Sequence, residues 1–134
     1  IGVNGQDLQN LKFKHLSSKN GLPNNSITNI FKDSKGFMWL GSEEGLYRYD
    51  GYDYITYKND ESDSHSISGN YIWYIYEDKD RNLWIANNNC LNLYNRDKDY
   101  FERYYINNDP QNKSIIYHLF EDSRKNFWIG TSNG

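Results

Sequence analysis

Short runs of apolar and aromatic residues alternate with polar clusters along most of the chain. The runs are rich in Ile, Tyr, Phe and Trp, and clusters of Asp, Asn, Gly and Lys separate them. Runs of this composition between turn-forming residues are typical of β-strands and their turns. No stretch of helical length carries the i, i+3, i+4, i+7 apolar stripe of an amphipathic helix. The pattern therefore predicts an all-β chain.

The pattern occurs three times in register, over residues 26–50, 71–95 and 114–134. Trp39, Trp84 and Trp128 recur at spacings of 45 and 44 residues. Repeats of about 40 to 50 residues, each with four short antiparallel strands, are typical of the blades of a β-propeller. The other positions that share these spacings are Asp33, Asp78 and Asp122; Ile27, Ile72 and Ile116; Ile30, Ile75 and Leu119; and Gly41, Ala86 and Gly130.

We expect strands at 27–32, 37–42, 45–50 and 54–58 in the first repeat, and at 72–77, 82–87, 91–95 and 100–105 in the second. The predicted fold is an incomplete propeller of about two and a half blades. Its expected parts are an N-terminal leader at 1–10, a strand at 11–24 that would close the ring, blade 1 at 25–69, blade 2 at 70–113 and a partial blade 3 at 114–134. The leader is interpreted either as the remnant of a signal peptide or as an ordinary N-terminus.

The repeated residues are expected to be structural. A sheet face in a propeller is buried against the next blade, so Trp39, Trp84 and Trp128 are predicted to lie between blades. Gly41 and Gly130 are expected to make room for a close approach of the backbone.

The turn after the first strand of each repeat begins with Asp and is expected to need a left-handed residue. Gly36 fills that position in the first turn, whereas Arg81 and Lys125 stand there in the other two. Asn82 and Asn126 follow directly and tolerate left-handed geometry better. The sequence therefore predicts that these two turns shift by one residue.

Composition excludes several classes of function. The formal net charge is −3, from 15 basic and 18 acidic residues that form no long blocks, which disfavours a nucleic-acid partner. The longest apolar run, Tyr71 to Tyr76, is far shorter than the roughly 20 residues of a membrane-spanning helix. Cys90 is the single cysteine, so neither an internal disulfide nor a cysteine zinc cluster is possible, and we expect it to be buried.

No catalytic residue, metal site or cofactor is predicted. Catalysis needs a few unique groups in one geometry, whereas the prominent carboxylates recur as one structural position. His15, His65 and His118 stand at unrelated positions of the repeat and lack metal-binding spacing.

Two clusters have the chemistry to bind a sugar, through aromatic faces for stacking and amides for hydroxyl groups on loops of a rigid scaffold. Trp73 has no counterpart in the other repeats. Core packing and turn formation are the alternative interpretation of the same residues. The candidate ligand-binding residues are Tyr71, Trp73 and Tyr74, after the polar loop 59–70, and Asn87, Asn88 and Asn89 in a turn.

The sequence "DSKGFMWLGSEEGLYRYDG" at 33–51, preceded by "GLPNNSI" at 21–27, resembles the regulator-propeller repeats of two-component sensors. The motif returns as "NFWIGTSNG" at 126–134. The second repeat departs most, with Ala86 in place of Gly and Cys90 in the position of Gly45. The resemblance covers the chain from about Leu11 onward.

The resemblance implies a function for the whole protein. It implies that the chain is the first part of the periplasmic sensor domain of a hybrid two-component histidine kinase. Such a kinase would detect oligosaccharides and regulate genes for glycan use. Its implied partners are an oligosaccharide, the remaining blades and a second copy in a homodimer, with membrane contact only through a downstream helix. Two alternatives stay open, namely a propeller enzyme such as a polysaccharide lyase or glycosidase, and a protein-interaction propeller.

Two and a half blades cannot close a ring. Closure protects the faces and inner edges of the blades, so a piece of this size would expose the apolar face of blade 1 and an unpaired strand of blade 3. We therefore expect the chain either to be part of a longer protein or to associate with other copies through its open edges.

Overall fold

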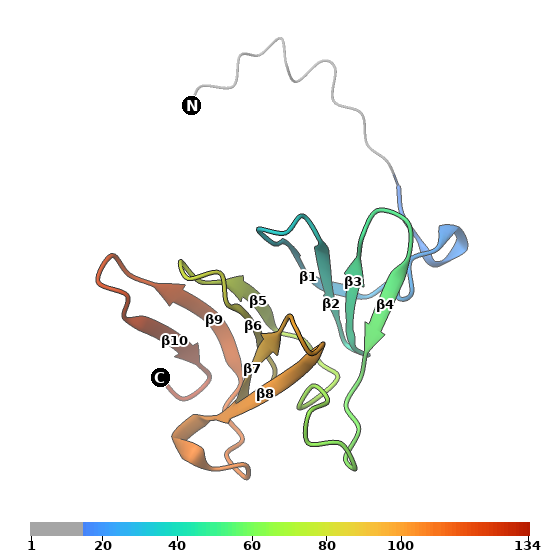
Figure 1. Ribbon diagram of the computed structural model, residues 1–134. Coiled ribbons are helices and arrows are strands. Elements are labelled where there is room, and N and C mark those ends of the chain that lie inside the picture. Colours follow the sequence, from blue (N-terminus) through green and yellow to red (C-terminus); the bar gives the residue numbers. More distant parts are fainter. Residues whose placement is uncertain (1–14) are drawn as a thin grey trace.

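The computed structural model describes residues 15–134, which form three antiparallel sheets (Figure 1). Two short 3-10 turns, η2 and η3, accompany the strands, and none of the helices in the described residues is long and apolar enough to cross a membrane. The elements are η2 (Ser18–Asn20), β1 (Ile27–Lys32), β2 (Met38–Ser42), β3 (Leu46–Tyr49), β4 (Tyr54–Tyr57), β5 (Tyr74–Glu77), β6 (Leu83–Ala86), β7 (Cys90–Asn95), β8 (Tyr100–Tyr105), η3 (Ile106–Asn108), β9 (Ile116–Glu121) and β10 (Phe127–Thr131).

Each sheet is a meander in which every strand pairs with its neighbour in the chain. The orders are β1-β2-β3-β4 in blade 1, β5-β6-β7-β8 in blade 2, and a two-stranded pair of β9 and β10 in the partial blade 3. β5 lies beside both β1 and β9, so the first strands of successive blades are adjacent. The blades follow one another side by side (Figure 1), which confirms the predicted propeller-type, all-β fold.

The strands agree with those expected from the repeat, except at the start of the second blade. There the predicted strand begins at residue 72, whereas β5 begins at Tyr74. The backbone N–H of Ile72 donates to the Ser42 carbonyl of blade 1, at 2.9 Å. The chain is therefore still bound to the preceding blade where the repeat predicts that the new strand starts.

The segment expected to close the ring lies partly outside the described residues, as does the expected leader at 1–10. The remaining residues, 15–24, contain η2 and no strand. Asn25 supports this turn, because its side chain accepts from the Ser18 amide and donates to the Ser18 hydroxyl, both at 2.9 Å. The described part of this segment therefore differs from the expected strand.

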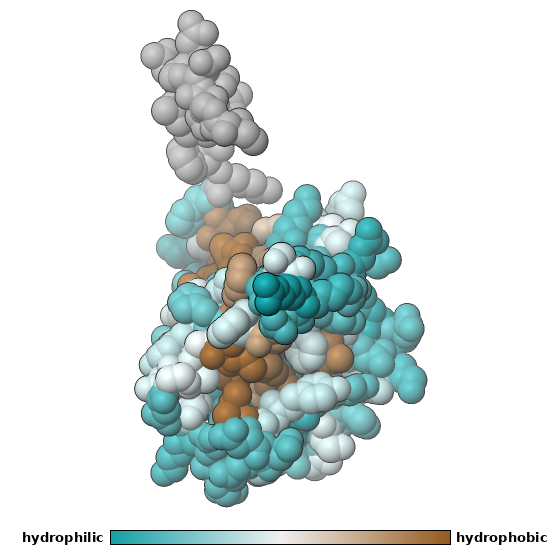
Figure 2. Space-filling view, turned by 90° about the vertical axis from the view of Figure 1, so that its left-hand side faces the viewer, coloured by the Kyte–Doolittle hydropathy of each residue, from teal (hydrophilic) through white to brown (hydrophobic). Residues whose placement is uncertain are grey.

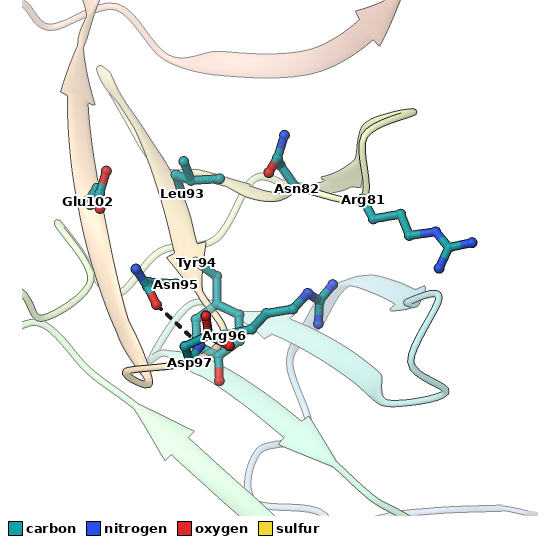
Figure 3. Close-up of a pocket in the computed structure, with 8 residues that line it drawn as sticks. All are labelled: Arg81, Asn82, Leu93, Tyr94, Asn95, Arg96, Asp97 and Glu102. Atoms are coloured by element: carbon teal, nitrogen blue, oxygen red, sulfur yellow. Dashed lines mark hydrogen bonds between the residues drawn. The ribbon is translucent and has the colours of Figure 1, made fainter.

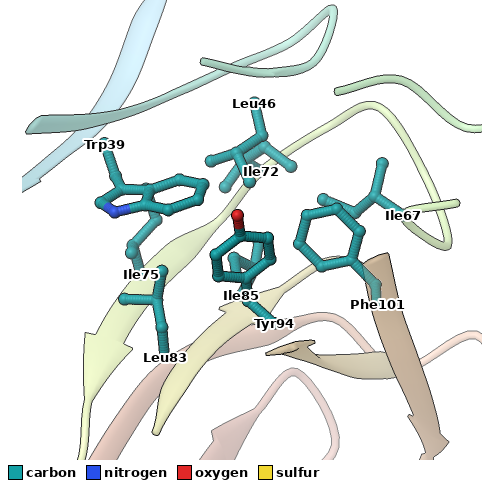
Figure 4. Packing of buried hydrophobic residues seen from close by; sticks show 9 residues of the cluster. All are labelled: Trp39, Leu46, Ile67, Ile72, Ile75, Leu83, Ile85, Tyr94 and Phe101. Carbon is teal, nitrogen blue, oxygen red and sulfur yellow. The ribbon is translucent and has the colours of Figure 1, made fainter. Parts of the chain in front are cut away.

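The main apolar core lies between blades 1 and 2. Trp39 and Leu46 of blade 1 meet Ile75, Leu83 and other buried residues of blade 2 (Figure 4). The Trp39 ring lies edge-on to Tyr94 across this interface, with centroids 4.9 Å apart. A second, smaller core joins blade 2 to the partial blade 3 and contains Ala86, Leu91, Ile116 and Leu119.

The three repeated Trp residues differ in burial according to what lies beyond them. Trp39 is fully buried and Trp84 is partly buried, whereas Trp128 is 61% exposed. The structure thus departs from the expected burial of Trp128, because no sheet formed by residues 15–134 packs on that side of β10. Figure 2 looks onto the side where β9 and β10 lie and shows apolar side chains uncovered among polar ones.

The turns between the first two strands of each blade do not shift as the sequence predicted. Gly36, Arg81 and Lys125 all have positive φ, of 93°, 67° and 65°. Asn82 and Asn126 have another task, since the side-chain amide of each donates to the carboxylate of the Asp that begins the turn, at 2.9 Å. Keeping this hydrogen bond leaves the preceding residue to take the left-handed conformation.

Candidate functional site

The candidate ligand-binding residues gather at one end of the blades. The connections between blades, at 58–73 and 106–115, lie at the lower end of the view in Figure 1, opposite the turns that begin with Asp33 and Asp78. The turn between β6 and β7, which carries Asn87 to Asn89, lies at this same end. Loops on a rigid β scaffold are common positions for ligand contacts.

Tyr71, Trp73 and Asn88 form one cluster. The rings of Tyr71 and Trp73 stack with centroids 4.4 Å apart and an interplanar angle of 29°. The indole Nε1 of Trp73 donates to Oδ1 of Asn88 at 3.1 Å. The structure therefore brings together one aromatic pair and one amide that the sequence placed 15 residues apart.

Tyr117 joins this cluster from the next blade. Its ring meets Trp73 edge-on, with centroids 5.5 Å apart, and its side chain is 40% exposed. The sequence analysis missed Tyr117, although it follows Ile116 as Trp73 follows Ile72 in the aligned repeats. The packing of β9 against β5 places the two rings together. The resulting aromatic surface spans two blades.

The other three candidate residues have structural contacts. Tyr74 packs on the smaller core and lies edge-on to His118, with ring centroids 5.2 Å apart. The buried Asn87 side chain donates to the carbonyl groups of Gly69 and Tyr71, at 2.7 and 2.8 Å. These two residues therefore hold the scaffold beneath the cluster.

Asn89 also supports the loop rather than pointing to open solvent. Its amide donates to the carbonyl groups of Asp109 and Pro110, both at 3.1 Å. The backbone around it binds the next blade, because the Asn88 carbonyl accepts from the Ile116 amide at 2.9 Å. The turn between β6 and β7 is thus held both by the connection that follows β8 and by the first strand of blade 3.

A cavity of about 490 Å³ adjoins this cluster. Four of its lining residues carry side-chain amides, and Lys113 contributes the only charge among them. Amide groups both donate and accept hydrogen bonds, as hydroxyl-rich ligands require. The lining residues are Asn88, Asn89, Pro110, Gln111, Asn112, Lys113 and Ile115.

A second cavity, of about 310 Å³, is lined only by blade 2 residues, from the turn between β5 and β6, from β7, from the turn between β7 and β8 and from β8 (Figure 3). Arg96 reaches from the turn between β7 and β8 toward the blade 1 strands in this view. Its guanidinium donates to Asp33 Oδ2 at 2.7 Å and to Glu77 Oε1 at 2.8 Å. The Arg96 guanidinium is therefore engaged in holding blades 1 and 2 together.

A third cavity, of about 240 Å³, lies beside the loop that contains Asp60 and His65.

The recurring aspartates have a shared structural task. In each blade the carboxylate accepts from the indole Nε1 of the repeated Trp, from Trp39 to Asp33 and from Trp84 to Asp78 at 2.9 Å. Burial alone would raise the pKa of Asp33, but hydrogen bonds from Arg96, Trp39 and the Phe37 amide together hold that pKa below its usual value. The Asp33 carboxylate is therefore held in its ionised form by these hydrogen bonds, which assigns it a structural task.

Two further features of residues 15–134 concern metal binding and thiol chemistry. No group of three or more His, Cys, Asp or Glu side chains there is placed to hold a metal ion. Cys90 is buried, and burial raises the pKa of its thiol, which opposes reactivity.

Comparisons with known proteins agree with the fold and the repeat. The extracellular domain of a protein described as the hybrid two-component system BT3049 from B. thetaiotaomicron superposes with a TM-score of 0.72 and 31% identity, over 87% of this chain and 17% of that chain. The corresponding domain of BT4673 from the same organism gives 0.70 and 34%, over 82% and 16%. This chain spans about a sixth of the length of these structures.

Sequence comparison supports the same relationship. The chain is 37% identical over 59 residues to Histidine kinase P4 of Formosa agariphila, which is 44% of this chain and 4% of that protein. The family described as "Two component regulator propeller" matches at residues 21–44, 66–89 and 110–133, together more than half of the chain. Each match contains the whole segment from the repeated Asp to the repeated Trp of one blade. The chain therefore belongs to the two-component regulator propeller family.

Proposed function

We propose that this chain is part of the periplasmic sensor domain of a hybrid two-component histidine kinase, and that its aromatic and amide cluster binds an oligosaccharide. The similar solved domains are extracellular parts of such systems, and the similar curated protein is a histidine kinase. The chain itself contributes binding rather than catalysis in this proposal.

The observation that carries the proposal is the pairing of Trp73 with Asn88. The stacked Tyr71 and Trp73 rings offer an apolar face to a sugar ring, and the amides beside them bond hydroxyl groups. Only the second repeat has Trp at this position, where Thr28 and Tyr117 stand in the other two, so the blade core alone does not require Trp73. An amide-lined cavity next to an aromatic surface is the arrangement that a neutral or weakly charged saccharide fits.

Titration calorimetry of the intact sensor domain against a panel of oligosaccharides tests the proposal. At least one fragment should bind, and Trp73→Ala should weaken that binding about tenfold or more, while the melting temperature changes little. The matched control is Tyr52→Ala, because Tyr52 is 90% exposed in the turn between β3 and β4, at the opposite end. It should leave binding unchanged.

Two outcomes would refute parts of the proposal. If no fragment binds the folded domain, the protein-interaction alternative is favoured. If Trp73→Ala lowers stability as strongly as a core substitution, then the side chain is structural and the ligand contacts other blades.

A further inference from the structure

The two faces of each blade are different, and every interface between blades joins one face of each kind. We call the side with the repeated Trp the following face, and the opposite side the preceding face. On the preceding face the first strand buries one aliphatic residue, Ile75 in blade 2 at 2% exposed and Leu119 in blade 3 at 3%. The same position in blade 1 is Ile30, which is 61% exposed. Blade 1 therefore leaves this part of its preceding face open.

A carboxylate two residues later joins each blade to the one before. Glu77 accepts from the backbone N–H and the hydroxyl of Ser34 in blade 1, both at 2.8 Å. Glu121 accepts from the backbone N–H of Lys79 in blade 2, also at 2.8 Å. Ser34 and Lys79 are equivalent residues of the Asp-containing turns. The contact is thus repeated, and it fixes how one blade sits on the next.

Blade 1 breaks this pattern because Lys32 stands where Glu77 and Glu121 stand. The Lys32 side chain is exposed and forms no ion pair or hydrogen bond with residues 15–134. An ammonium group only donates hydrogen bonds, so it cannot accept from the N–H of a turn. The blade 1 face therefore cannot make the contact that the other two blades make.

The same mismatch applies to a second copy of this chain. Its following face ends at Trp128 and Phe120, which are 61% and 60% exposed. Its turn offers the backbone N–H of Ser123, the residue equivalent to Ser34, which has no acceptor among the described residues. Docking this face onto blade 1 of another copy would set two donors, that N–H and Lys32, against each other.

We propose that Lys32 selects the partner of the blade 1 face, and that this partner is a propeller blade whose turn carries an Asp or Glu side chain at the position of Ser34. A carboxylate there would accept a hydrogen bond from the Lys32 ammonium group and restore the missing contact. The donor would then be the first strand of blade 1, and the acceptor would be the turn of its partner. Two observations carry this inference, namely the Glu-to-turn contact of blades 2 and 3 and the Lys that replaces the Glu in blade 1. The inference does not depend on a sugar ligand. Lys32 thereby opposes head-to-tail assembly of identical segments.

Four versions of this chain test the proposal by charge exchange. They are the wild type, Lys32→Glu, Ser123→Glu and the double variant. Association is measured by sedimentation velocity over a range of concentrations, and melting curves show that all four fold. Lys79 at the equivalent position of blade 2 shows that this turn accepts a long charged side chain.

Both single variants should associate head to tail at about tenfold lower concentration than the wild type. Lys32→Glu restores the carboxylate of the repeat, and Ser123→Glu supplies the acidic turn, with charge-assisted hydrogen bonds in each case. The double variant should associate no better than the wild type, because like charges then meet. Added salt should weaken association most for Ser123→Glu.

The proposal is overturned if the two single variants associate no more strongly than the wild type, or if the double variant associates as strongly as they do. Either result would mean that the group at position 32 does not decide which turn docks on blade 1. Equal salt dependence of all four proteins would likewise contradict an ion pair at this interface.

Discussion

Ile72 of blade 2 lies directly on Gly41 of blade 1. A Cβ at position 41 would stand 2.7 Å from Ile72 Cγ2 and 2.9 Å from Ile72 Cβ. The close neighbour is a branched side chain, not the backbone approach expected from the sequence. Because Ile72 also donates its backbone N–H to Ser42, the two blades are held together at this point by both packing and hydrogen bonding.

Replacing Gly41 by Ala should therefore destabilise the fold by roughly 1 to 3 kcal/mol, since overpacking a tight contact forces side chains or backbone to shift. Urea unfolding of the wild type and the variant measures this. Gly130→Ala is the matched control, because a Cβ there would find its nearest neighbour, His118 Cβ, at 3.8 Å. A loss at Gly130 equal to that at Gly41 would show that the Ile72 contact is not the cause.

The three Trp-to-Ala substitutions should form a graded series. Trp39→Ala should cost about 3 to 5 kcal/mol in unfolding free energy, since it empties a fully enclosed site. Trp84→Ala should cost less, and Trp128→Ala about 1 kcal/mol or less, because an exposed ring has little to lose. Denaturant melts of this chain give the order. Equal losses of unfolding free energy at all three positions would contradict the finding that Trp39 lies buried between two blades whereas Trp128 is exposed.

Arg96→Ala should destabilise the interface between blades 1 and 2 by about 2 to 4 kcal/mol. The substitution leaves the fully buried Asp33 carboxylate without its cation and releases Glu77, and breaking such a pair costs more than forming it gains. Chemical denaturation is the measurement. Arg81→Ala serves as the control, because the exposed Arg81 side chain has no partner among the described residues, and it should change the unfolding free energy by less than about 0.5 kcal/mol.

Stability should fall in acid because the structural aspartates are more acidic in the folded protein. Burial raises the pKa of Asp78, but hydrogen bonds from Trp84 and Asn82 outweigh it and lower that pKa below 3.8. In blade 3, hydrogen bonds from Asn126 and Trp128 lower the pKa of Asp122 to about 2. A lowered folded pKa stabilises the protein above the unfolded value and loses this effect as the pH falls through the folded value.

Unfolding free energy should thus be level above about pH 4 and decline as the pH falls from there toward about 2. Asp78→Asn should lower stability near neutral pH and flatten this decline. Urea melts at a series of pH values compare the two proteins. Parallel curves in acid would assign the decline to other carboxylates.

Much of the fold follows from the amino-acid sequence, because each strand is short, apolar and bounded by turn-forming residues at a constant spacing. The departures occur where tertiary contacts override local preference. Ile72 is bound to blade 1 rather than to its own sheet, and Arg81 adopts a left-handed conformation because Asn82 is needed by the Asp78 carboxylate.

The candidate site was predictable only in part. Trp73 stands out because neither of the other repeats has Trp at its position, and Asn88 was predicted as part of a ligand-binding loop because of its side-chain amide. Tyr117 stands at the position of Trp73 in the third repeat, but only the packing of neighbouring blades places its ring against Trp73. The sequence also does not show that Asn88 contacts Trp73 whereas Asn87 is buried and bound to the backbone, because this difference depends on the direction of each side chain in the folded turn.

The hydrogen bond between the indole of each of the three repeated Trp residues and the Asp six residues before it closes within a single hairpin. A loop this short has a small closure entropy, and hairpins form within about 1 to 10 microseconds. Chains are synthesised from the N-terminus, so the hairpin of one blade can orient its indole before the next blade has left the ribosome. Each new blade then meets a ring that is already in position, and the propeller can grow by ordered addition along the chain.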